Sequence, residues 1–295
     1  MPRSPHINVF YDEFSQDMVK LIPGVATYDM VFNHNIFLQD IYQFLHNDTF
    51  TFTILRHPHT NFLSSFNFFS MKGGYEYLTN ISGPSRLDTY FTNPDKYEPN
   101  VKSLSFTNNR QSIDLGFDAV NHKFNDTQYI QSFIERLEKS LDVVLITEYF
   151  DQSVILLKRL LGWTTQDVLY FTKIRTPTDK KFYYSLTEQQ KKILTNRTAA
   201  DSRLYAHFLD IFKHKISTQV GLDDEVAEFR EILGKLVNFC VDRHPGRTNQ
   251  FLVPAGRWSD EISIVRSKCK WLDLRELDFT DYFKQEQAKD FDWMV

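Results

Sequence analysis

The chain has 295 residues, of which 42% are hydrophobic and 15% aromatic, so we predict a packed globular core and exclude a disordered or collagen-like chain. Its 34 Lys and Arg residues nearly balance 38 Asp and Glu residues, and this gives no electrostatic reason to expect a nucleic-acid partner. Two cysteines exclude a disulfide-dense fold and a CxxC zinc site, and we expect no metal cofactor.

The N-terminal segment lacks the apolar stretch of a signal peptide, and no run approaches the roughly 18 apolar residues of a membrane helix. Four N-glycosylation sequons nevertheless indicate passage through the secretory pathway. They begin at Asn47, Asn80, Asn125 and Asn196. Nothing visible in the sequence would deliver the chain to that compartment.

The first predicted elements are two strands and a helix. Residues 28–34 and 50–55 are rich in β-branched and aromatic residues, which is typical of strands. Pro58 suits a first helical turn, and Phe62, Phe66 and Phe69 then recur at spacings of four and three. The sequence therefore predicts a strand, a tight turn and a helix around residue 56.

Residues 70–128 contain several Gly, Pro and Asn pairs and are predicted to form a long, structured loop region. A helix with apolar spacing over 130–141 leads into the near-continuous apolar run 142–147, which is typical of a buried parallel strand. A second amphipathic helix follows over 154–161. This alternation predicts the α/β class, with a helix-covered parallel sheet.

The C-terminal half is predicted to be helical. Apolar spacing indicates two long helices between residues 186 and 242, and residues 245–295 are expected to form an irregular tail packed on the domain. Because no convincing linker or repeat interrupts the chain, we expect a single domain over residues 1–295.

Arg56 and Ser64 are the sharpest candidates for binding chemistry. A helix N-terminus offers unpaired amides and the positive end of its dipole, and an Arg at the strand end adds a planar fork suited to phosphate. Ser64 lies two turns into the predicted helix and can add a hydroxyl. The alternative is that Arg56 pairs with a neighbouring acid and that Ser64 has no special role.

The strand–helix segment resembles the 3′-phosphate-binding segment of sulfotransferases that use 3′-phosphoadenosine 5′-phosphosulfate (PAPS). Five further blocks are similar, in the same order, to the galactose-3-O-sulfotransferase family, and the resemblance covers about residues 28 to 242. These blocks are residues 93–94, 113–118, 145–153, 157–163 and 167–171. The resemblance implies a sulfotransferase fold related to the P-loop kinases, with Arg56 and Ser64 holding the 3′-phosphate of PAPS.

The resemblance also directs attention to His34, because the family has a similar Asn-His pair at a strand end. Sulfuryl transfer needs a base for the proton of the acceptor hydroxyl, and a histidine with a pKa near 6.5 suits that task. His34 is therefore the candidate catalytic residue, and a structural histidine is the alternative. Glu148 can face the same cleft, whereas Asp151 is expected to cap a helix and Arg110 to be a solvated loop charge.

The family has an N-terminal loop rich in Lys, Thr, Ser and Gly that binds the 5′-phosphosulfate, and residues 1–30 do not supply it. We expect either an N-terminally incomplete chain of a longer protein or a member that does not catalyse. The resemblance implies a single-pass type II protein of the Golgi lumen whose membrane anchor lies outside this chain. In that compartment Cys240 and Cys269 either form a disulfide or remain two separate thiols.

The leading interpretation is a PAPS-dependent carbohydrate sulfotransferase that modifies the 3-hydroxyl of galactose on a glycolipid or glycan, as in galactosylceramide sulfotransferases. The alternative is a non-catalytic sulfotransferase-like protein that binds a glycan or a protein partner. Aromatic residues between 68 and 91 are expected to supply a sugar-stacking surface, although core packing explains at least half of them equally well. They are Phe68, Phe69, Tyr75, Tyr77, Tyr90 and Phe91.

Overall fold

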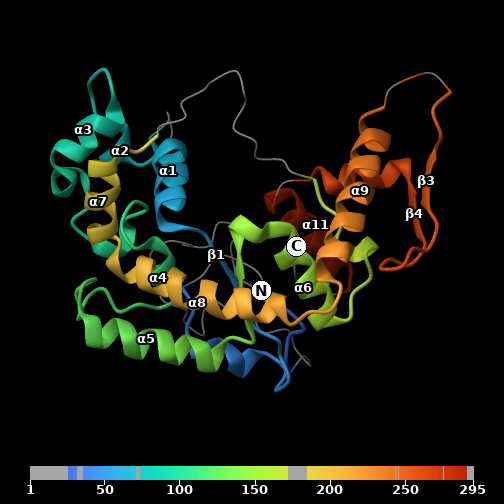
Figure 1. Cartoon of the computed structure of the whole chain (residues 1–295), viewed down its shortest axis with the longest axis horizontal. Helices are drawn as coiled ribbons and strands as arrows, with labels where there is room; N and C mark the ends of the chain where they lie inside the picture. The colour runs from blue at the N-terminus through green and yellow to red at the C-terminus, as the bar shows by residue number, and fades with distance from the viewer. Residues whose placement is uncertain are drawn as a thin grey trace. The chain divides into compact units, whose positions relative to one another are not determined.

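The computed structural model divides the chain into two compact units (Figure 1). The first contains Met1–Glu148 and Phe182–Lys213, and the second contains Tyr149–Lys181 and His214–Val295. Whether they make one sulfotransferase-like domain stays a prediction. The structure describes residues 26–31, 36–70, 74–171, 185–242, 244, 246–274 and 276–290.

Two parallel strands form the sheet of the first unit. β1 (Phe52–Leu55) pairs with β2 (Val143–Ile146), and Leu55 lies opposite Ile146 at the end of the register. β2 is buried along its whole length, as its apolar run predicts. The fold is therefore a mixture of helices with a small parallel sheet, and the two strands lie where the sequence predicts them.

The predicted strand at residues 28–34 is described only in part. Tyr28 forms a single parallel bridge with Leu45, and its amide donates to the carbonyl oxygen of Phe44 at 2.7 Å. The 3₁₀ helix η2 (Gln39–Phe44) ends directly before Leu45. Residues 32–35 lie outside the described residues.

Short helices fill the long connection from β1 to β2. The region predicted as a structured loop, residues 70–128, contains helical turns of three to seven residues because Gly, Pro and Asn repeatedly interrupt the chain. Asp126 ends the region by accepting a hydrogen bond from the amide of Tyr129 at 3.1 Å, which caps the next helix. The helices are α1 (Pro58–Phe69), α2 (Glu76–Thr79), α3 (Arg86–Thr92), η3 (Pro94–Tyr97), η4 (Lys102–Leu104), α4 (Arg110–Asp114) and α5 (Thr127–Ser140).

One hydrophobic core of the first unit forms around α1. Phe62 and Phe66 point inward from α1, and Phe66 is fully buried. The centroid of each ring lies 5.5 Å from the centroid of the Tyr90 ring. Leu194 of α7 (Glu188–Arg197) belongs to the same cluster. The phenylalanine spacing that predicts α1 is thus also the spacing that builds this core.

Three helices, rather than two, occupy residues 186–242. The predicted long helices are α8 (Ala199–Ser217) and α9 (Leu222–Val241). α7 is separate, since Thr187 and Gln190 form a reciprocal capping box at its start. Its polar composition hides it from a search for apolar periodicity.

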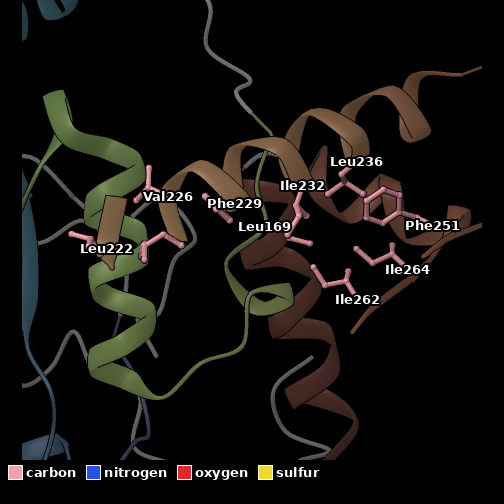
Figure 2. Close-up of a cluster of buried hydrophobic side chains, with 10 residues drawn as sticks. Leu169, Leu222, Val226, Phe229, Ile232, Leu236, Phe251, Ile262 and Ile264 are labelled. Atoms are coloured by element: carbon pink, nitrogen blue, oxygen red, sulfur yellow. The ribbon is translucent and has the colours of Figure 1, made fainter. Parts of the chain in front are cut away.

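The second unit packs α9 against a small antiparallel hairpin. Figure 2 shows apolar side chains of α9, spaced three or four residues apart, beside the inward side chains of the two strands. β3 (Gln250–Val253) pairs with β4 (Ile262–Val265). Ile262 and Ile264 are buried while their neighbours are exposed, which is the alternation of a sheet with one solvated face.

The segment after residue 245, expected to be irregular, contains regular elements. Besides the hairpin it has η7 (Arg266–Lys268), α10 (Cys269–Leu272) and α11 (Glu276–Asp290). Four-residue strands separated by an eight-residue loop give little sequence signal, because each strand is stable only against its partner and α9.

A disulfide joins Cys240, near the end of α9, to Cys269, at the start of α10. Their Cα atoms are 5.7 Å apart. Of the two alternatives left open by the sequence, the bridge is therefore the one in the structure.

α9 is also held to α6 (Phe150–Leu161) by buried charges. Glu225 accepts from Lys158 Nζ at 2.6 Å and from Arg159 Nε at 2.7 Å. Glu225 is 4% exposed, so both cations are needed to offset the cost of burying its carboxylate.

Among the described residues, none of the helices is both long and apolar enough to cross a lipid bilayer.

Candidate functional site

The β1–α1 junction places Arg56 directly after the last paired residue of β1. His57 is the N-cap of α1, and its Nδ1 accepts a hydrogen bond from the amide of His59 at 3.2 Å. Pro58 occupies the first helical position, where its fixed φ favours the turn and its missing N–H costs nothing. The predicted strand, tight turn and helix are thus confirmed, and they present Arg56 at the carboxyl end of a parallel strand.

The side chain of Arg56 lies along the first turn of α1. Its Nε donates to Thr60 Oγ1 at 3.3 Å, at the weak end of hydrogen bonding. Within the described ranges, no carboxylate lies within salt-bridge distance of its guanidinium. A guanidinium has five N–H donors, so this one retains the capacity to bind an anion in two-pronged fashion.

Ser64 lies one turn beyond Thr60 on α1 and is exposed. Residues four apart share a helix face, so Ser64 lies on the same side of α1 as Thr60, which Arg56 contacts. The spacing of Arg56 and Ser64 therefore fits the expected pair, and their role as ligands stays a prediction. His34 lies outside the described residues.

Glu148 lies on the other side of the junction, just after β2. Its Oε1 accepts from the amide of His57 at 2.9 Å, and its Oε2 accepts from the Tyr205 hydroxyl at 3.1 Å. Its Oε1 is also 3.2 Å from Thr60 Oγ1. A carboxylate at a helix N-terminus is stabilised by the helix dipole. Glu148 therefore occupies the N-terminus of α1, where an anionic ligand would otherwise bind. Anion binding at this junction must therefore depend on Arg56.

His59, in the first turn of α1, adds little positive charge. His59 is partly buried, and this burial, together with the nearby His57 and Lys191, lowers its pKa below the usual 6.5. Its Nε2 lies 2.8 Å from Thr195 Oγ1. At neutral pH His59 is therefore neutral and bonds to α7 rather than serving as an anion ligand.

Sequence reasoning missed Gln111, which contacts the backbone of Arg56. The amide of Arg56 donates to Gln111 Oε1 at 2.7 Å, and Gln111 Nε2 donates to the carbonyl oxygen of Arg56 at 2.9 Å. Gln111 belongs to α4, 55 positions along the chain. A lone Gln at that separation carries no sequence signal, because the contact exists only after the long connection has folded.

Two predictions about charged residues are wrong. Arg110 is 6% exposed, pairs with Asp114 and lies 4.6 Å from the Phe106 ring centroid, so it is not a solvated loop charge. Asp151 does not cap a helix, since the N-cap of α6 is Tyr149. It accepts instead from the Tyr170 hydroxyl at 2.7 Å and from Arg230 Nε at 2.5 Å.

The six aromatic residues expected to stack on a sugar lie in different environments: Phe68 is exposed, and Phe69 packs against the core around α1. Tyr90 and Phe91 are buried in the core around α1, as the alternative of core packing implied. Tyr75 and Tyr77 instead line a pocket of about 620 Å³ together with Tyr97, and polar groups also line it. The Tyr77 hydroxyl accepts from the amide of Phe106 at 2.9 Å, and burial raises its pKa to about 12, so the phenol stays neutral. Flat rings with a few polar groups suit a sugar.

Within the part of the chain that the structure describes, no group of three or more His, Cys, Asp or Glu side chains is arranged to hold a metal ion.

A family model described as galactose-3-O-sulfotransferase matches residues 1–254. The chain is 29% identical to galactose-3-O-sulfotransferase 3 of Mus musculus, over 80% of this chain and 52% of that protein. It is 31% identical to galactose-3-O-sulfotransferase 2 of Sus scrofa, over 72% of this chain and 53% of that protein. It is 30% identical to galactosylceramide sulfotransferase of Homo sapiens, over 78% of this chain and 54% of that protein.

The chain thus spans about half the length of the curated relatives it matches. No solved structure matches it.

Proposed function

The chain belongs to the galactose-3-O-sulfotransferase family, and on that premise we propose that it transfers a sulfuryl group from PAPS to the 3-hydroxyl of a galactose on a glycolipid or glycan. The observation that carries the proposal is Arg56, a cation at the carboxyl end of a parallel strand with no carboxylate partner among the described residues. Family likeness also leads us to infer that β1 and β2 belong to a sulfotransferase fold related to the P-loop kinases.

Arg56 and Ser64 hold the 3′-phosphate in this proposal. The donors of Arg56 that Thr60 leaves available match a phosphate in geometry and charge. Ser64 adds one hydroxyl donor from the same side of α1. Glu148 already accepts a hydrogen bond from the backbone amide of His57, so the phosphate binds to the guanidinium of Arg56 rather than to that amide.

His34 is the proposed catalytic base. PAPS, when bound, supplies a sulfuryl group attached to a phosphate leaving group. His34 accepts the proton of the galactose 3-hydroxyl as that oxygen attacks sulfur. Tyr75 and Tyr77 are proposed to orient the acceptor by stacking on the sugar.

Binding of adenosine 3′,5′-bisphosphate, the desulfated product, tests the phosphate site. The Arg56→Ala variant should bind it about 10- to 100-fold more weakly in calorimetry, as expected for a lost charge-assisted hydrogen bond. Adenosine 5′-phosphate lacks the 3′-phosphate, so its affinity should hardly change. Arg203→Ala is the matched control, because Arg203 is exposed on α8 and lies outside the site. Equal affinity of Arg56→Ala and the wild type for the bisphosphate would refute the assignment.

Transfer of labelled sulfate from PAPS to galactosylceramide and to a galactose-terminated glycan tests the reaction. We expect transfer by a chain extended at its N-terminus and its loss when that chain carries His34→Ala, with bisphosphate affinity unchanged. Glycan binding without transfer, even by a chain extended at its N-terminus, would favour the alternative of a non-catalytic binding protein.

We propose that the protein works in the Golgi lumen as part of a single-pass type II membrane protein. Two observations support an oxidising lumenal compartment: the disulfide between Cys240 and Cys269, and sequon asparagines that are all exposed.

A further inference from the structure

The backbone of Arg56 is held by a side chain rather than by a strand. The ladder between β1 and β2 ends at Leu55 and Ile146. Beyond it, Gln111 accepts from the amide of Arg56 and donates to its carbonyl oxygen, at 2.7 and 2.9 Å. One primary amide thus satisfies both backbone groups of the residue, in the manner of a paired strand residue.

Gln111 is itself tied to α8 through Asp201. Asp201 Oδ2 accepts a hydrogen bond from the backbone amide of Gln111 at 3.3 Å. Its Oδ1 accepts from the amide and the hydroxyl of Ser112 at 2.7 and 2.6 Å. Asp201 and Ser112 are 2% and 0% exposed, so water does not compete for these bonds.

Asn109 completes the connection from the other side. Its Oδ1 accepts from the amide of Asp201 at 2.9 Å, and its Nδ2 donates to the carbonyl oxygen of Arg197 at 2.7 Å. Asn109 has a left-handed backbone with φ of 50°, which asparagine adopts more readily than most residues and which these contacts stabilise here. The start of α4 is therefore locked between the end of α7 and the start of α8.

We propose that Gln111 and Asp201 are positioning residues, which set the direction in which Arg56 presents its guanidinium to the 3′-phosphate. This inference rests on the proposed function, in which Arg56 binds that phosphate. Without the side-chain amide of Gln111, the backbone of Arg56 loses both hydrogen bonds and samples a wider range of φ and ψ. Arg56 then keeps its charge but less often points toward the ligand, which lowers the affinity by the fraction of competent conformers.

Binding of adenosine 3′,5′-bisphosphate to Gln111→Met tests the inference, because methionine has a similar length and no hydrogen-bonding amide. We expect about fivefold to tenfold weaker binding, with little change for adenosine 5′-phosphate. Gln131→Met is the matched control, since Gln131 is exposed on α5 and its side chain donates to the neighbouring Glu135, away from Arg56. Asp201→Asn should weaken binding in the same direction.

A double variant separates positioning from a general structural loss. If Gln111 acts through Arg56, then Gln111→Met causes no further loss of bisphosphate affinity in the Arg56→Ala background. Independent, multiplicative losses would overturn the inference. So would a loss in Arg56→Ala with none in Gln111→Met, and the phosphate site would then still stand. No loss in Arg56→Ala itself would instead remove the proposed function.

Gln111→Glu provides a second route if Gln111→Met does not fold. The carboxylate keeps an acceptor for the amide of Arg56 but sets a negative oxygen against its carbonyl oxygen. We expect bisphosphate binding to fall at least fivefold at pH 7.5 in the folded variant. Wild-type affinity in Gln111→Glu would overturn the inference.

Discussion

At the scale of single residues, Asp201 is a carboxyl buried in the first unit. Burial raises the pKa of its carboxyl from 3.8 to about 6, and the nearby Asp114 acts in the same direction. Hydrogen bonds from Ser112 and Gln111 oppose this shift, because they favour the ionised form. Burial of this carboxyl, which holds the start of α4, thus makes folding sensitive to pH.

Asp201 should make the protein less stable as the pH rises from about 4 to about 6. An acid with a raised pKa in the folded state binds more protons there than when unfolded, so its contribution is complete below pH 4 and is lost by pH 6. The difference in the free energy of unfolding between wild type and Asp201→Asn, measured in urea, should therefore fall over this range. A difference that is constant or rises with pH would contradict the assignment.

At the scale of elements, Gly116 allows the turn after α4. Its φ is +83°, and an added Cβ would lie 2.5 Å from the carbonyl oxygen of Phe37. Both the backbone conformation and the close approach therefore require glycine. Gly116 falls in the 113–118 block, one of those on which the family resemblance rests. The geometry of the turn explains why this position of the block is a glycine.

Gly116→Ala should lower the free energy of unfolding by about 1 to 3 kcal/mol. Gly234→Ala is the opposite control, because Gly234 lies inside α9 with nothing within 4 Å of an added Cβ. That change should stabilise the protein by about 0.5 to 1 kcal/mol. Urea unfolding followed by circular dichroism measures both, and a neutral or stabilising effect of Gly116→Ala would show that the backbone at Gly116 does not require glycine.

At the scale of the whole molecule, the disulfide is a covalent constraint on the second unit. It closes a loop between Cys240 and Cys269, which are 29 positions apart. The loop contains the β3–β4 hairpin, whose four-residue strands bury few side chains. The bridge therefore supports a part of the chain with little core of its own.

Replacing both cysteines by serine should lower the free energy of unfolding of the second unit by roughly 3 to 4 kcal/mol. Thermal unfolding with and without a reductant measures this. Reduction should shift the wild type to the midpoint of the double variant and leave the double variant unchanged. An equal effect of reductant on both proteins would show that the bridge does not contribute.

Expression through the secretory pathway tests the proposed compartment. The four sequon asparagines are exposed, so the folded chain can carry glycans at Asn47, Asn80, Asn125 and Asn196. We expect enzymatic deglycosylation to lower the mass of the secreted chain. An unglycosylated, reduced chain would argue against a lumenal protein.

The sequence by itself determined the elements whose signals are local. Strand propensity, Pro58 and the spacing of Phe62, Phe66 and Phe69 specify β1 and α1, and hence the position of Arg56 at a strand end. The uninterrupted apolar run specifies β2. These signals are readable because backbone preference and helical periodicity act within a few residues.

Only the tertiary structure decided which distant residues surround Arg56. Gln111 and Glu148 are ordinary polar residues in sequence, and folding brings them to the backbone of Arg56 and His57 from 55 and 91 positions away. The burial of Arg110 and the pairing of β3 with β4 likewise depend on neighbours remote in sequence or on short segments. Hydrogen bonds and burial of this kind form between segments, so no local pattern encodes them.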